Sequence, residues 1–135
     1  MKSYTDINQS KKLAEILPIE SADMCFANDG TSIKIDANPF NVRKLMWKNV
    51  QLIPCWSLAA LLDVLPTDYI IHKHYFLEIS KMGDNAKPYE VRYFRFREDW
   101  EGANFGRITH ISYTSDNLID ACYEMIVKLH EQKLL

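Results

Sequence analysis

Two histidines, His72 and His74, come closest in type and spacing to a metal site. Apolar and polar side chains alternate over residues 69–81, which predicts a strand. Residues i and i+2 of a strand share a face, so both imidazoles could approach one ion. Glu78 on that face and His110 on a neighbouring strand could add ligands. Because spacing marks no third ligand, we favour a solvated strand face as the explanation of the pair.

Arginines alternate with aromatic residues in a second strand, predicted over residues 89–97. Such a pattern can stack bases and hold phosphates of single-stranded nucleic acid. Phe94 and Phe96 would share one face, whereas Arg95 and Arg97 would share the other. The glycine of an RNA-recognition strand is absent, so we favour a structural strand with one charged face. The candidate nucleic-acid-binding residues are Arg92, Arg95, Arg97, Phe94 and Phe96.

The three cysteines, Cys25, Cys55 and Cys122, are too widely spaced for a disulfide framework or a zinc motif. Cys55 precedes a predicted helix, whose dipole could favour a thiolate nucleophile. We favour instead a small apolar residue packed beside Trp56. Cys122 lies on the apolar stripe of the C-terminal helix, where we expect it in the core.

Other catalytic patterns are weaker still. The acidic residues in the segment 98–101 are near neighbours in one loop, whereas a glycosidase needs two carboxylates that face each other across a groove. The four glycines form no phosphate-binding loop. We therefore predict no catalytic residues and no cofactor. A metal-dependent or thiol enzyme at the histidines or Cys55 remains the alternative to a protein without enzymatic activity.

The clearest structural signal is a short helix between two prolines, residues 54–66. Ser57 is a good N-cap, because its hydroxyl can accept a hydrogen bond from the first turn. Trp56 and Leu61 then occupy the positions of a hydrophobic staple. Pro66 ends the helix. The apolar stripe of this helix consists of Leu58, Leu61, Leu62 and Leu65.

Periodicity and turn signals predict the other elements. A helix capped by Thr5 covers residues 5–17, and a β-hairpin joins residues 24–27 to residues 33–35. A three-stranded meander covers residues 69–81, 89–97 and 107–113, and caps at residues 114–116 begin the last helix. The predicted class is α+β: a small antiparallel sheet, hairpin plus meander, packed with three helices. We expect a single domain over residues 1–135.

Composition excludes several classes of protein. Net charge is −2 and apolar residues make up 47% of the chain, which is typical of a globular protein without a strongly basic or acidic partner surface. No apolar run approaches the roughly 20 residues of a membrane-spanning helix. Unpaired cysteines and a polar N-terminal segment then favour the cytoplasm.

Three stretches also carry a resemblance: residues 18–24, 54–62 and 116–126. Their order and spacing resemble a group of small uncharacterised proteins encoded in Bacteroidales genomes, often in prophage-like or mobile regions. The resemblance implies a cytoplasmic accessory protein of phage or mobile-element origin. It implies no catalytic residues.

The function we predict is a non-enzymatic module that binds a protein partner or a second copy of itself. We base this prediction on the three Trp, seven Tyr and six Phe, and on the absence of residues spaced as in a catalytic motif. Aromatic residues are favoured at protein interfaces. The alternative is binding of single-stranded nucleic acid by the arginine-rich strand.

Overall fold

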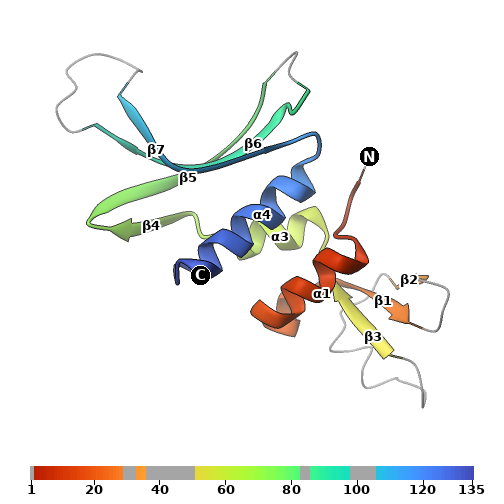
Figure 1. Cartoon of the computed structure of the whole chain (residues 1–135). Coiled ribbons are helices and arrows are strands. Elements are labelled where there is room, and N and C mark those ends of the chain that lie inside the picture. The colour runs from red at the N-terminus through yellow and green to blue at the C-terminus, as the bar shows by residue number, and fades with distance from the viewer. Residues whose placement is uncertain (1, 29–32, 36–50, 83–85, 98–105) are drawn as a thin grey trace. The chain divides into compact units, whose positions relative to one another are not determined.

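The computed structural model describes residues 2–28, 33–35, 51–82, 86–97 and 106–135. These residues form two compact units, Met1–Val64 and Leu65–Leu135, each with at least one helix and an antiparallel sheet (Figure 1). The predicted α+β class with a C-terminal helix is confirmed. The expectation of one domain stays a prediction, because two compact units can still fold cooperatively.

The first unit contains the predicted hairpin, extended by a strand that the sequence did not reveal. The sheet order is β2-β1-β3, with all pairs antiparallel. Pro54 lies within β3, opposite Cys25, although we expected it at a helix start. Proline has no backbone N–H, and it is tolerated here because β3 is an edge strand among the described residues. The elements are α1 (Ile7–Ile16), a 3₁₀ turn η1 (Ile19–Ser21), β1 (Met24–Asn28), β2 (Ile33–Ile35), β3 (Gln51–Cys55) and α3 (Leu58–Val64).

Helix caps in this unit follow the predicted chemistry, with one correction. Ser57 caps α3 as predicted, since its hydroxyl accepts the N–H of Ala60 at 3.2 Å. The cap of α1 is Asp6 rather than Thr5, and Gln9 completes a capping box. Thr5 is wholly buried instead, and its hydroxyl accepts the backbone N–H of Trp56.

The core of the first unit lies on its sheet. Trp56 and Leu61, the predicted staple pair, are wholly buried. A cluster formed by β1 and β3 side chains is covered in part by Tyr4 and Ile7 from the N-terminal segment and α1. The cluster consists of Met24, Phe26, Ile53 and Cys55.

The second unit is a four-stranded meander with a helix on one face (Figure 1). The sheet order is β4-β5-β6-β7, and α4 packs against β6 and β7. Cys122 is wholly buried on α4, as predicted from the apolar stripe. The elements are β4 (Asp68–Ile71), β5 (Lys73–Lys81), β6 (Tyr89–Phe96), β7 (Arg107–Ser115) and α4 (Leu118–Glu131).

The single strand predicted over residues 69–81 is two strands. His72 has φ 59°, and the chain reverses there, so that Ile71 pairs with Lys73. Alternation hid this turn, because Tyr69 and Tyr75 lie opposite each other on one face on either side of it. The shared strand face that we predicted for His72 and His74 therefore does not exist.

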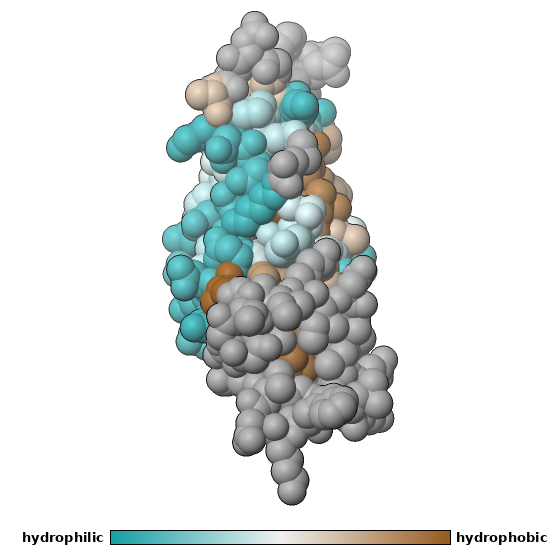
Figure 2. Space-filling view, turned by 90° about the vertical axis from the view of Figure 1, so that its right-hand side faces the viewer, coloured by the Kyte–Doolittle hydropathy of each residue, from teal (hydrophilic) through white to brown (hydrophobic). Residues whose placement is uncertain are grey.

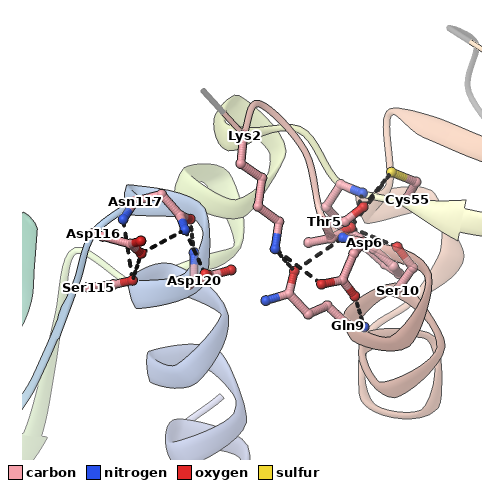
Figure 3. Close-up of polar contacts among 11 residues, drawn as sticks. Lys2, Thr5, Asp6, Gln9, Ser10, Cys55, Ser115, Asp116, Asn117 and Asp120 are labelled. Carbon is pink, nitrogen blue, oxygen red and sulfur yellow. Dashed lines mark hydrogen bonds and ion pairs between the residues drawn. The ribbon is translucent and has the colours of Figure 1, made fainter. Parts of the chain in front are cut away.

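Two further details of the second unit differ from expectation. A β-bulge at His110 separates the pairs Tyr93–Ile111 and Phe94–Thr109. The strand β7 includes Thr114 and Ser115, two of the three predicted caps, and Asn117 caps α4 by accepting the N–H of Asp120 at 2.8 Å (Figure 3). Among the described residues, no helix has the length and apolar character needed to cross a membrane.

Candidate binding face

The two faces of the four-stranded sheet differ in what covers them. Val91, Tyr93 and Ile111 are buried on the face that α4 covers. Because side chains alternate along a strand, the residues between them lie on the opposite face, which no helix of this unit's described part covers. We call this second surface the outer face. It carries His74, Phe76, Glu78, Arg92, Phe94, Phe96 and Arg107.

An aromatic cluster forms the centre of the outer face. The His74 ring stacks on Phe76 with centroids 4.3 Å apart. Phe76 lies 6.3 Å from Phe94 and 6.1 Å from Phe96, and the last two meet edge to face at 5.3 Å. Phe94 is only 6% exposed, whereas Phe96 is 58% exposed. The cluster therefore ends in an aromatic ring that lies open to solvent.

The arginines of the outer face are ion-paired. Arg92 donates two hydrogen bonds to Glu78, at 2.6 and 3.0 Å, and lies 3.7 Å from Glu90. Arg107 also pairs with Glu78. Its guanidinium lies 4.8 Å from the centre of the Phe94 ring, within the range of a cation–π contact. The carboxylates thus neutralise both cations.

Of the predicted nucleic-acid-binding residues, the structure brings Arg92, Phe94 and Phe96 together on one face. Arg107 joins them, and no sequence pattern indicated it, because its contact depends on the pairing of β6 with β7. Arg95 pairs with Ile108 near the end of the sheet, apart from the ion-paired arginines.

A hollow of about 190 Å³ lies at that end of the sheet. Beside it, Nε2 of His74 bonds the carboxylate of Asp68, and this hydrogen bond lowers the pKa of Asp68. The hollow is lined by Lys73, His74, Phe76, Arg95 and Phe96.

The predicted metal ligands do not converge. His74 is bound to Asp68, Glu78 holds two arginines, and Nδ1 of His110 lies 2.5 Å from the hydroxyl of Tyr69. Within the described ranges, no three His, Cys, Asp or Glu side chains are grouped so as to hold a metal ion. His72, in the turn, shares no strand face with His74.

The cysteines are packed rather than exposed. Cys55 is wholly buried, and its Sγ donates to the carbonyl of Thr5 at 3.5 Å. Burial raises the pKa of Cys122 to about 12, which keeps its thiol protonated at neutral pH. Neither side chain is placed to act as a nucleophile. The acidic segment 98–101 lies outside the described residues.

Fold and surface together define an α+β module with an aromatic sheet face whose charges are paired. In comparisons with protein families, curated proteins and solved structures, nothing matches this chain. What the chain does must therefore be argued from its own side chains.

Proposed function

We propose that this protein is a non-enzymatic binding module whose outer face docks on a protein, either a partner or a second copy of this chain. The observation that carries the proposal is the 58% exposure of Phe96 at the edge of an aromatic cluster with neutralised charges. Exposed aromatic side chains are typical anchors of protein interfaces.

Pairing of the charges favours a protein over a nucleic acid on this face. Binding of nucleic-acid phosphates needs cations that can neutralise them and displace the counterions condensed on the nucleic acid. Arg92 and Arg107 would have to leave Glu78, whose carboxylate would also repel a phosphate. A protein surface can instead cover the ring of Phe96 and leave these ion pairs intact.

Hydrophobic side chains elsewhere do not form a broad competing surface on the view in Figure 2. There, hydrophilic side chains occupy much of the described surface, and hydrophobic ones form smaller patches. Ile70 and Met82 are also exposed, at 73% and 56%, but Phe96 is an exposed ring that continues an aromatic cluster.

Location and origin belong to the same proposal. Three buried cysteines that form no disulfide support a reducing compartment such as the cytoplasm. Origin in a phage or mobile element rests on the resemblance of residues 18–24, 54–62 and 116–126 alone.

The test places a photo-crosslinking amino acid at position 96 or, as a matched control, at position 82. Met82 is similarly exposed, at 56%, and lies just beyond β5. We expect one discrete crosslinked product from position 96 and none from position 82. The mass of the product distinguishes a second copy from another protein.

Substitutions at the same two positions test how much each side chain contributes to the affinity of the complex. Phe96→Asp should weaken the complex about 30-fold, the effect of losing an anchor worth about 2 kcal/mol. Met82→Asp should leave it unchanged, as measured by sedimentation velocity over a range of concentrations. Equal crosslinking at both positions, or equal effects of both substitutions, would contradict the proposal.

A further inference from the structure

The hollow at the end of the sheet is lined by two kinds of side chain, aromatic and basic. Its apolar part comes from Phe76 and Phe96, and its charged part comes from Lys73 and Arg95. Lys73 begins β5, and Arg95 lies near the end of β6, so the meander brings together side chains 22 positions apart in the sequence.

The aromatic side of the hollow is suited to a flat ring. Phe94 contacts Phe96 edge to face, with an interplanar angle of 85°, and thereby supports it from behind. Any base can stack on an aromatic side chain through its flat face. His74 and Phe76, already stacked at 4.3 Å, extend the flat surface.

The charged side of the hollow is suited to an anion. Among the described residues, Arg95 makes no ion pair, in contrast to Arg92 and its two carboxylates. None of the five lining residues is acidic. The carboxylate of Asp68 is paired with His74.

Size restricts the ligand further. The hollow, about 190 Å³, is smaller than the roughly 300 Å³ at which pockets for drug-sized molecules begin. Only part of a nucleotide fits this volume, so the rest of such a ligand would extend out of the hollow.

We propose that the hollow is a binding site for a planar heteroaromatic ring that carries a phosphate, the chemistry of a nucleoside monophosphate. The base stacks on Phe96, and Arg95 and Lys73 hold the phosphate. This small-molecule site goes beyond the protein-docking function proposed above, and because both use the ring of Phe96, the ligand and the docked protein would compete for it. Its ligand is either a free nucleotide or the end of a single strand.

Isothermal titration with adenosine 5′-monophosphate, adenosine and ribose 5-phosphate tests both halves of the site, at low salt with the full chain. The monophosphate should bind about tenfold more tightly than either fragment, because each fragment loses one half of the contacts. If adenosine binds as tightly as the monophosphate, the cations do not hold the phosphate. If ribose 5-phosphate binds as tightly, the aromatic rings do not hold the base. Either result, or no binding by the monophosphate, overturns the proposal.

Matched variants locate the site. Lys73→Gln and Arg95→Gln should each weaken binding of the monophosphate about tenfold, the usual effect of losing one charge-assisted hydrogen bond. Lys81→Gln, at the other end of β5, should change it less than about twofold. An equal loss from Lys81→Gln would show non-specific attraction and overturn the proposal. None of the three substitutions removes Phe96, so crosslinking from position 96 reports separately on protein docking.

A short oligothymidylate identifies the source of the ligand. Binding no tighter than that of thymidine monophosphate indicates a free nucleotide. Binding more than about tenfold tighter, with a steep salt dependence, indicates a single strand that continues beyond the hollow. In both cases Arg95→Gln should weaken binding, and unchanged binding by this variant would contradict the proposed site.

Discussion

At the scale of single residues, Thr5 shows how a side chain that resembles a cap can serve the interior. Its hydroxyl accepts the backbone N–H of Trp56 at 3.1 Å and lies 2.8 Å from the hydroxyl of Ser10 (Figure 3). Its carbonyl accepts the thiol of Cys55. The N-terminal segment is thereby fastened to the end of β3, a contact that spans about 50 positions in the sequence.

Thr5→Val tests this role, since it keeps the shape of the side chain and removes the hydroxyl. The Trp56 N–H would then be buried without its side-chain acceptor, which costs about 1–3 kcal/mol. We expect the free energy of unfolding in urea to fall by that amount. Ser3→Ala, at an exposed neighbour, should change it by less than about 0.5 kcal/mol. Equal effects of the two substitutions would contradict the role of Thr5.

At the scale of elements, backbone conformation at two turns determines where the second unit's strands and helix end. His72 reverses the chain between β4 and β5 with φ 59°, and Lys133 follows α4 with the same φ. The left-handed region is unfavourable for residues with a Cβ, although histidine tolerates it better than most. The hairpin is formed despite this cost because β4 and β5 pair over four residue pairs.

His72→Gly should therefore stabilise the protein. Glycine removes the cost of the positive φ, but it also increases the entropy of the unfolded chain. The net gain in the free energy of unfolding should be about 0.5–1 kcal/mol. Urea denaturation measures it. Lys128→Gly, inside α4, should instead lose about 1 kcal/mol, as glycine does in a helix interior. A loss of stability at position 72 would show that the imidazole itself holds the turn.

At the scale of the whole molecule, the buried acidic groups of the second unit make stability depend on alkaline pH. Burial raises the pKa of Tyr69 to about 12, with Tyr75 adding to the effect, and burial also raises the pKa of Tyr93 and of Cys122. In the unfolded chain these groups lose their protons at lower pH, near 9 for the thiol and 10 for the phenols. Above pH 9 the unfolded state therefore binds fewer protons than the folded state.

The free energy of unfolding should consequently fall as pH rises from about 9 to 12, and it should be insensitive to these groups below pH 8. Urea denaturation at intervals of pH measures the slope. Tyr69→Phe removes one of the titrating groups, so its slope above pH 10 should be shallower than that of the parent protein. An unchanged slope would show that Tyr69 ionises equally easily in both states.

Local patterns in the sequence determined much of the fold. The N-cap at Ser57, the buried stripe that includes Cys122, and the hairpin of β1 and β2 follow from interactions between residues close in the chain. Such interactions depend on helix and strand periodicity, which a single sequence displays directly. The α+β class follows from the same periodicities.

Only the tertiary structure decided the candidate sites. Arg92 and Arg107 form ion pairs with Glu78 because three strands align, and Arg95 and Lys73 line one hollow because β5 and β6 are neighbours in the sheet. Apolar and polar residues alternate through His72 without a break, so the sequence did not reveal the turn there. Because of this turn, His72 and His74 do not share a strand face. Strand register depends on contacts between distant residues, and a one-residue change in it moves every side chain to the other face of the sheet.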